Sequence, residues 1–497
     1  MGADSTKTSR YTETERKFEV VENTVAPSFA GLSAVARVER SLSQSLDAVY
    51  FDTPARDLAR HRITLRRRTG GTDEGWHVKL PAGVDTRTEI RAPLTDDDTG
   101  EVPDNIRDVV LAIVRDAPLA PVARISTERT VETLYDADGA QLAEFCDDDV
   151  RASADGGDEL RWREWELELV PGADTDVFDR LTGRLLDAGA EPSGHGSKLA
   201  RVLGTPPASE KPSPTGDQLH DAIAGHVAEL LEWDRAVRAD AHDSVHQMRV
   251  TVRKIRSLLQ SAPDTEAPEW LLDELRELGA VLGIARDAEV LAQRYEKALD
   301  ALPAEQVRGP VRRRLVEDTQ KRYQTGWKRS LTAMRSPRYF RLLEALESLT
   351  TAAPAEPAPK SAVADRITEA HRRVRKAAKT ARKLAKDGAD DRAADEALHK
   401  IRKRAKRLRY VAAASDRRKV AERAKAVQSL LGDHQDSVVS RGHLLRQADL
   451  AHAAGEDTFT YGVLFQREIE TAQRCEDRLD DALKALDKVV SKATKGG

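Results

Sequence analysis

The chain has 497 residues, of which 40% are hydrophobic and 33% are charged, which predicts two or three domains with apolar cores. No apolar stretch approaches the roughly 18 residues of a membrane-spanning helix, and the amino-terminal segment lacks the apolar core of a secretion signal, so we expect no membrane partner. The two cysteines, Cys146 and Cys475, indicate no disulfide framework and favour a cytoplasmic protein.

Charge divides the chain in two. Residues 1–205 carry 26 Lys and Arg against 39 Asp and Glu, a net charge of −13, whereas the remainder carries 54 against 45, a net charge of +9. An acidic module followed by a basic one indicates two domains that bind partners of different charge. Ordinary drift in surface charge is the alternative explanation.

The predicted elements change in kind along the chain. Residues 13–20, 62–68, 75–80 and 161–170 alternate with period two, as antiparallel strands do. Beyond a Pro- and Ser-rich linker at 205–218, long Ala, Leu, Arg, Glu and Lys segments repeat at helical spacing, with a second linker at 350–360. We therefore expect a flexible start (1–10), a β-rich domain (11–204), an all-helical domain in two bundles (219–490) and a tail (491–497), a multidomain α+β protein.

Charged side chains share faces on the predicted strands, because residues two apart in a strand point the same way. The shared faces are those of Glu13, Glu15 and Lys17, of Arg66 and Arg68, of His77 and Lys79, and of Glu164, Glu166 and Glu168. A solvent-exposed face is the usual fate of such residues, but like charges side by side are unfavourable without a counter-ion. Closing the sheet into a barrel would place these groups in one lumen. Carboxylates there suit Mg²⁺ or Mn²⁺ and cations suit phosphate oxygens, a combination typical of phosphoryl transfer to water.

The stretch ETERK, with Glu13, Glu15 and Lys17, resembles the ExExK signature of the CYTH superfamily, the triphosphate tunnel metalloenzymes. Six further elements resemble the family's motifs in the right order, between residues 11 and about 203. They are LRRR with Arg66 and Arg68, WHVK with Lys79, ERTV with Arg129, FCD with Asp147, ELE with Glu166 and Glu168, and SK with Lys198.

The resemblance implies an eight-stranded antiparallel tunnel with flanking helices that binds a triphosphate and one or two divalent metal ions, Mg²⁺ or Mn²⁺. It implies metal binding by Glu13, Glu15, Asp147, Glu166 and Glu168, and phosphate binding by Arg66, Arg68, Lys79, Arg129 and Lys198. By similarity to some members, Lys17 paired with Tyr50 would activate water, for which the lysine needs a lowered pKa.

Strand register leaves some placements open. Glu144, Asp147, Asp148 and Asp149 are all candidates for the lumen-facing acid, and Asp147 is preferred because the family aspartate follows a hydrophobic run. Arg67 and Arg124 are expected outside, and Glu89 and Arg91 as solvated side chains near one mouth.

The helical half contains a diverged internal repeat. The stretch HQMRVTVRKIR, starting at His246, is echoed by HKIRKRAKRLR, starting at His399, 153 residues later. Each copy continues with a second element, LGIARDAEV from Leu282 and LGDHQDSVV from Leu431, 149 residues apart. Similar offsets predict a duplicated helical bundle with a pseudo-twofold axis.

Each copy places a basic stripe on a helix. His246, Arg249, Arg253 and Arg256 follow the spacing three, four, three, and so do His399, Arg402, Lys406 and Arg409. A solvated face balanced by acidic residues is the usual alternative, but 399–409 contains no acidic residue, so this stripe repels itself unless an anion binds it.

These motifs resemble the CHAD domain, the conserved-histidine α-helical module, over roughly 219–490. The resemblance implies two bundles around a basic pore that binds inorganic polyphosphate, and evenly spaced cations suit such a linear polyanion. The implied contacts are His246, Arg249, Arg253, Arg256, His399, Arg402, Lys406, Arg409 and His434. A 4% aromatic content argues against nucleic acid, and the surrounding cations argue against metal binding by the histidines.

The sequence thus predicts a CYTH–CHAD protein that hydrolyses inorganic triphosphate to pyrophosphate and phosphate and binds polyphosphate, near polyphosphate granules. Two alternatives stay open. The same tunnel would serve a nucleotide or thiamine triphosphatase or an adenylate cyclase, and a tunnel without turnover would leave a polyphosphate-binding protein.

Overall fold

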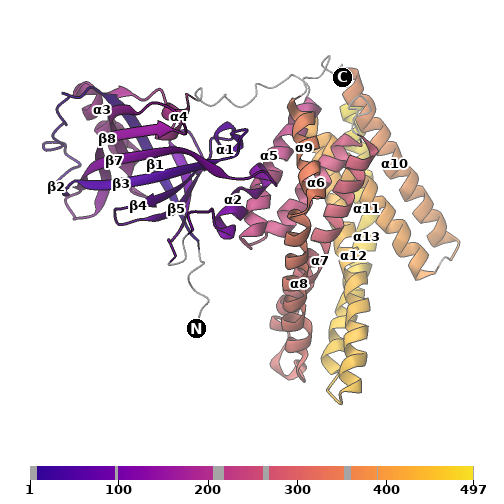
Figure 1. Ribbon diagram of the computed structural model, residues 1–497. Coiled ribbons are helices and arrows are strands. Elements are labelled where there is room, and N and C mark those ends of the chain that lie inside the picture. Colours follow the sequence, from indigo (N-terminus) through magenta and orange to yellow (C-terminus); the bar gives the residue numbers. More distant parts are fainter. Residues whose placement is uncertain are drawn as a thin grey trace. The chain divides into compact units, whose positions relative to one another are not determined.

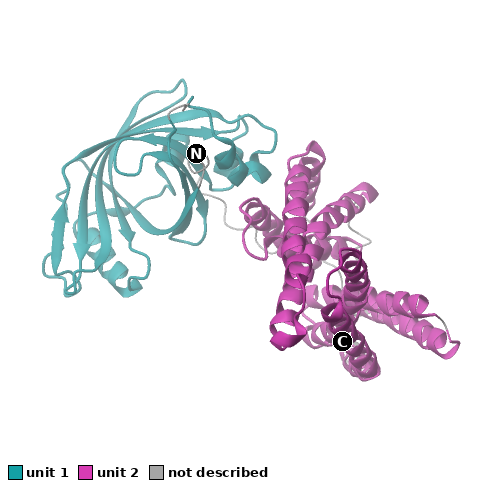
Figure 2. Cartoon of the chain, turned by 90° about the horizontal axis from the view of Figure 1, so that it is seen from below, with its two compact units in different colours: residues 1–213 teal, residues 214–497 magenta. Residues whose placement is uncertain are grey.

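The structure is a computed structural model that describes residues 8–95, 99–204, 218–260, 268–351, 360–388 and 390–495. The chain forms two compact units, residues 1–213 and 214–497 (Figure 2). The predicted linker at 205–218 lies outside the described residues except for Gln218, and so does most of the predicted linker at 350–360.

The first unit is a closed barrel of eight antiparallel strands, as the sequence predicts (Figure 1). Its strands follow the order β1–β6–β5–β4–β3–β7–β8–β9, and β9 pairs with β1 to close the ring. Short strands β2 (Arg37–Arg40) and β10 (Glu191–Pro192) pair with β7 and β1. The eight barrel strands are β1 (Ser9–Val20), β3 (Gln44–Asp52), β4 (Thr64–Thr69), β5 (Gly75–Pro81), β6 (Thr86–Ala92), β7 (Ala120–Tyr135), β8 (Gln141–Ala154) and β9 (Leu160–Leu169).

Strand alternation sends apolar side chains outward, where helices cover them. Phe145, Trp165 and Leu167 on β8 and β9 belong to one buried cluster with Phe178 and Leu181 of α3 (Thr175–Asp187). The short helix α1 (Asp57–Arg60) contacts β3 and β4, and α2 (Asp104–Val114) contacts β5. The remaining faces of the strands are left to line the lumen.

Helix α4 (Lys198–Leu203) packs against β7 and β8 and carries one site residue. Leu199 belongs to a buried cluster with Ala48, Ile125 and Val150. The side chain of Ser197 accepts a hydrogen bond from the Ala200 amide and caps the helix, which fixes where Lys198 starts.

The second unit is entirely helical in its described parts (Figure 1). Its helices are α5 (Gln218–Arg238), α6 (Ser244–Leu259), α7 (Glu269–Asp300), α8 (Asp318–Met334), α9 (Pro337–Thr351), α10 (Lys360–Lys386), α11 (Asp391–Ala414), α12 (Arg418–Ala453) and α13 (Phe459–Lys495), with short turns η1 (Ala304–Gln306) and η2 (Arg313–Glu317). Because α13 continues to Lys495, most of the segment 491–497 is helix rather than a tail. No described helix combines the length and hydropathy that crossing a bilayer requires.

The two repeats of the helical unit share packing. One buried cluster joins Tyr295 and Leu299 of α7 to Leu444 of α12 and Tyr461 of α13, so the first repeat packs directly on the second. A second cluster is built from α10 to α13 alone. The basic helices α6 and α11 of the two repeats also contact each other.

Close packing of α7 and α8 yields a first prediction. A Cβ atom at Gly326 of α8 would lie 2.7 Å from the amide nitrogen of Ala285 in α7. Gly326→Ala should therefore lower the stability of the helical unit by about 2 kcal/mol, measured by thermal and urea denaturation. At Gly462 of α13 the same substitution meets open space, so Gly462→Ala should raise stability by about 1 kcal/mol. Equal effects of the two substitutions would contradict this close contact.

Candidate functional site

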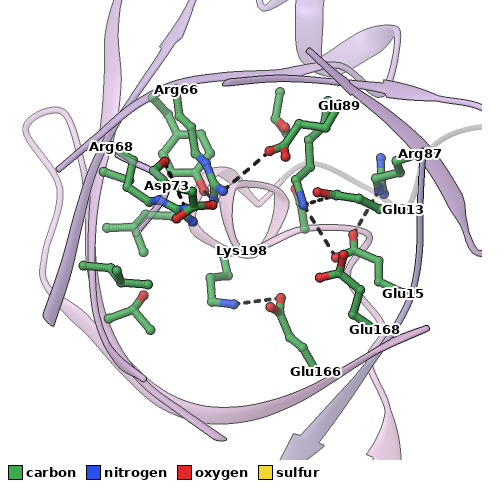
Figure 3. Close-up of a pocket in the computed structure, with 18 of the residues that line it drawn as sticks. Glu13, Glu15, Arg66, Arg68, Asp73, Arg87, Glu89, Glu166, Glu168 and Lys198 are labelled. Atoms are coloured by element: carbon green, nitrogen blue, oxygen red, sulfur yellow. Dashed lines mark hydrogen bonds and ion pairs between the residues drawn. The ribbon is translucent and has the colours of Figure 1, made fainter. Parts of the chain in front are cut away.

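The barrel lumen is lined mainly by charged side chains from the strands and α4 (Figure 3). The empty space between them, including the part open to solvent, is about 850 Å³. Arg66 and Arg68 lie on one side of the lumen, and Glu13, Glu15 and Glu168 lie on the other. This separation leaves room for an anion between the cations and a metal ion at the carboxylates.

The lumen brings together eleven of the twelve site residues predicted for this unit. They are Glu13, Glu15, Lys17, Tyr50, Arg66, Arg68, Lys79, Arg129, Glu166, Glu168 and Lys198. They come from β1, β3, β4, β5, β7, β9 and α4, so their assembly depends on closure of the barrel.

The twelfth residue, Asp147, was the wrong choice within its acidic run. Its carboxylate pairs with Arg163 at 2.6 Å and accepts a hydrogen bond from the indole of Trp165 at 3.1 Å, beside the apolar cluster that faces α3. The neighbouring Asp148 points the opposite way, because adjacent strand residues do so. Its side chain is fully buried and pairs with Arg129 at 2.6 Å and Lys198 at 2.9 Å. Asp148 is therefore the lumen-facing aspartate.

Strand β6 supplies lumen residues that we expected to be solvated. Glu89 is 0% exposed, and Nδ1 of His77 lies 2.9 Å from its carboxylate. Arg91 also pairs with Glu89, and Arg87 lies 3.3 Å from Glu15. The alternation of Arg87, Glu89 and Arg91 along β6 is the sequence signal that would have found this face.

Each lumen lysine pairs with at least two carboxylates. Lys17 pairs with Glu15 at 3.1 Å and with Glu166, and Lys79 lies 2.6 Å from Glu13 and 3.7 Å from Glu15. Lys198 reaches three acids, at distances of 2.9 Å to Asp148, 2.7 Å to Glu164 and 2.8 Å to Glu166. The lysines thus lie among the carboxylates, whereas Arg66 and Arg68 lie on the opposite side of the lumen from Glu13, Glu15 and Glu168.

The charge network decides the protonation of the predicted catalytic pair. Burial would lower the pKa of Lys17, but Glu15 and Glu166 outweigh burial and raise it, so the expected lowered pKa is wrong. Burial would raise the pKa of Tyr50, but Arg66 outweighs burial and lowers it. The Tyr50 hydroxyl accepts a hydrogen bond from Arg66 Nη1 at 3.3 Å. Lys17 is therefore held protonated, whereas Tyr50 loses a proton more readily than a free tyrosine.

The carboxylates of β1 and β9 fit a divalent cation. Glu15 stands directly opposite Glu168 in the strand register, and burial, followed by Glu13, raises the pKa of Glu168 to about 7. Oε1 of Glu164 and Oε2 of Glu13 are buried, and a lysine ammonium group lies 2.7 Å from the first and 2.6 Å from the second. Asp148, Glu164 and Glu166 each offer an oxygen within 4.8 Å of the others. An all-oxygen set of this kind matches the preference of Mg²⁺ and Mn²⁺.

In the helical unit, cations from both repeats converge. Burial, followed by Arg253 and Arg402 and then by Arg249 and Arg409, lowers the pKa of Lys406 to about 6. Arg249 packs over Gly283 and Arg402 packs over Gly432, so the two sequence elements of each repeat meet in the same way. These five residues, from α6 and α11, form what we call the basic cluster.

Counter-charges are few in the basic cluster. Arg249 pairs with Asp287 at 3.0 Å. Among the described residues no carboxylate oxygen is recorded within 4 Å of Arg253, Arg402, Lys406 or Arg409, nor of the neighbouring Arg256. The cluster therefore repels itself, as expected from the sequence of the second stripe, and would be relieved by an external anion.

The three predicted histidines differ in their surroundings. Burial, followed by Arg286 for His246 and by Lys403 for His399, lowers the pKa of both rings, so each is neutral at pH 7. His434 is 3% exposed and lies 3.0 Å from Glu476 and 3.7 Å from Asp395. Its nearest recorded partners are therefore acidic, and its place in the predicted polyphosphate site is not supported.

Comparison with known proteins follows the same division. The CYTH domain model matches residues 12–185 and the CHAD domain model matches residues 221–445. An uncharacterized protein of Mycobacterium tuberculosis is 58% identical and covers 99% of this chain and 100% of its own. The CHAD domain of the plant Ricinus communis (26% identity, TM-score 0.44) covers 55% of this chain and 92% of its own. A candidate adenylyl cyclase of Hippeastrum, with a stated dominant triphosphatase activity, is 19% identical and covers 39% of this chain and 96% of its own (TM-score 0.26).

The raised pKa of Glu168 predicts a pH-dependent effect of metal. Folding raises this pKa from about 4.5 to about 7, so without metal the stability falls as pH rises between these values. A divalent cation competes with the proton, so Mg²⁺ or Mn²⁺ should raise the melting temperature more near pH 8 than near pH 6. Glu168→Gln should abolish that pH difference, whereas Glu128→Gln, an exposed glutamate of β7, should keep it. A metal effect independent of pH in the unmodified protein would contradict the assignment.

Proposed function

The chain belongs to the family of proteins in which a CYTH domain is followed by a CHAD domain, and on that premise we propose that its barrel hydrolyses inorganic triphosphate with a divalent metal ion. The CYTH family includes triphosphatases and cyclases, and its tunnel enzymes use divalent metals. The observation that carries the proposal is the lumen itself, where buried cations face buried carboxylates around one cavity (Figure 3).

The cations are suited to hold a short phosphate chain. Arg66, Arg129 and Lys198 now pair with carboxylates or with Tyr50, and phosphate oxygens would take over these contacts. Arginine can hold two phosphate oxygens at once, which also fixes the orientation of the chain. We assign Arg66, Lys79, Arg129 and Lys198 to this role, and we assign Arg68, which now pairs with Asp73, to the end of the chain.

The metal would be held by the carboxylates on the other side of the lumen, Glu13, Glu15 and Glu168, with Asp148, Glu164 and Glu166 as a second group. When bound, it would neutralise charge that develops on the phosphoryl oxygens. Tyr50, whose pKa is lowered by Arg66, is suited to accept a proton from the attacking water. Lys17, protonated between Glu15 and Glu166, is suited to donate a hydrogen bond that orients the water.

We propose inorganic triphosphate rather than a nucleotide as the substrate because the lumen offers few aromatic side chains to a nucleotide base. Among its described lining residues Tyr50 is the sole aromatic, and its hydroxyl is already engaged by Arg66. A base would therefore find little to stack on. Incubation with ATP, followed by separation of ADP from cyclic AMP, tests the triphosphatase and cyclase alternatives directly.

We further propose that the helical unit binds polyphosphate at the basic cluster. Arg253, Arg402, Lys406 and Arg409 come from two repeats and face one another with few counter-charges. A linear polyanion would supply those charges and release its own condensed counterions. The helical unit would then concentrate polyphosphate around the protein. If the barrel had no catalytic activity, polyphosphate binding would be the protein's whole function.

The triphosphatase proposal predicts loss of activity from either side of the lumen. Arg66→Ala and Glu15→Gln should each lower kcat for tripolyphosphate about 100-fold, measured as orthophosphate release with Mg²⁺ or Mn²⁺. Arg124→Ala removes an exposed arginine from the outer face of β7 and should leave kcat unchanged. Full activity of both lumen variants on every triphosphate tried would contradict the proposal.

Polyphosphate binding should depend on the face of α11 that carries the basic-cluster residues Arg402, Lys406 and Arg409. Replacing Arg402, Lys406 and Arg409 with Gln should weaken binding and reduce the slope of log affinity against log salt by about 2. The matched control replaces Lys400, Lys403 and Arg404 on the exposed face of the same helix. An equal effect of the two triple variants would show general charge attraction and remove the basic cluster as the site.

A further inference from the structure

One carboxylate in the lumen comes from a turn rather than from a barrel strand. Residues 70–74 connect β4 to β5, and Gly70 and Gly71 adopt φ angles of +80° and +78°, which glycine adopts without strain. A Cβ atom at Gly70 would lie 2.3 Å from the carbonyl oxygen of Ser45, so glycine is also required for space. The turn folds back and places Asp73 among the lining residues.

Asp73 occupies the cations at its end of the lumen. Its carboxylate pairs with Arg68 and lies 3.5 Å from Nη1 of Arg91. Its carbonyl oxygen accepts a hydrogen bond from Arg68 at 3.3 Å and lies 2.9 Å from Nε2 of His77. In Figure 3 Asp73 lies beside Arg68, away from the cluster of Glu13, Glu15 and Glu168. Asp73 is therefore not part of that carboxylate cluster, although Arg91 lies between the two and its Nη2 is 3.1 Å from Glu13.

The contacts of Asp73 lie at one end of the barrel. Arg68 is the penultimate residue of β4 and Arg91 is the penultimate residue of β6, and both strands flank β5. A carboxylate on a guanidinium presents two oxygens much as a phosphate group does. A phosphate chain that extends to this end must displace the carboxylate of Asp73 and approach its negative charge.

We propose that Asp73 limits the number of phosphoryl groups that the lumen accepts, by holding Arg68 and Arg91 as an internal competitor for the end of the substrate. The inference rests on the proposed function, because it takes a phosphate chain as the ligand of the lumen. Arg66, Lys79 and Arg129 lie on strands and Lys198 lies on α4, and these four lining cations remain available to a short chain. Asp73 is then a residue that determines specificity and takes no part in the reaction.

The test compares Asp73→Asn with Asp85→Asn in the full chain. Asp85 lies in the next turn, between β5 and β6, and pairs with Arg16 at 2.9 Å, outside the residues that line the lumen. Both substitutions keep the shape of the side chain and remove one negative charge. The helical unit is identical in all proteins, so differences between them report the barrel.

The readout is the ratio of kcat/KM for tetrapolyphosphate to kcat/KM for tripolyphosphate. Asp73→Asn should raise this ratio about tenfold, because the terminal phosphate then gains one charge-assisted contact that the Asp73 carboxylate no longer blocks. Asp85→Asn should leave the ratio unchanged. An unchanged ratio in Asp73→Asn, or an equal change in Asp85→Asn, would overturn the inference.

Failure of the proposed function is recognised separately. If the unmodified protein hydrolyses neither anion, the triphosphatase proposal fails. The role of Asp73 is then read from the dissociation constants of the two anions by calorimetry, where the same tenfold change in ratio is expected. A ratio of dissociation constants that Asp73→Asn does not change would overturn the inference in that case as well.

Discussion

A charged side chain that points into an enclosed lumen must find an opposite charge there, because a buried unpaired charge costs several kcal/mol. Closure of the barrel imposes this condition on every second residue of its strands. Each lumen lysine accordingly pairs with at least two acids, and Arg129 joins β7 to β8 and β9 through Asp148 and Glu166. The same pairs that hold the lumen together are the groups a phosphate chain and a metal ion would compete for.

The helical unit deals with concentrated charge differently. Its basic cluster contains few carboxylates to balance the positive charges. The pKa of Lys406 is lowered as a result, because lysine can lose its proton whereas arginine remains charged. Glycine at positions 283 and 432 lets the guanidinium groups of Arg249 and Arg402 lie close to the helices beneath them. The barrel is thus neutralised from within, whereas in the described residues the basic cluster has a single ion pair, between Arg249 and Asp287.

Strand faces could be predicted from the sequence because period-two alternation fixes which residues share a side. That rule placed Glu13, Glu15, Arg66, Lys79 and Glu168 on charged strand faces, which line the lumen, whereas the eight-stranded barrel was implied by the resemblance to the CYTH family. It fails where neighbouring residues are alike, as in the run Asp147 to Asp149, since such a run has no alternation. It also says nothing of turn residues such as Asp73. The raised pKa of Lys17 depends on distances to Glu15 and Glu166 that follow only from closure.

Closure has a kinetic side as well. Lys17 stands opposite Glu166 in the pairing of β1 with β9, a contact between residues 149 positions apart. β1 can complete its pairing only after β9 has formed. Contacts between residues so distant in sequence form slowly, because the long intervening chain must be ordered first. Until then β1 and β9 each present an unpaired edge and unbalanced charges. During synthesis the nascent barrel therefore stays open until β9 has left the ribosome, and this interval is when it is most exposed to misfolding and aggregation.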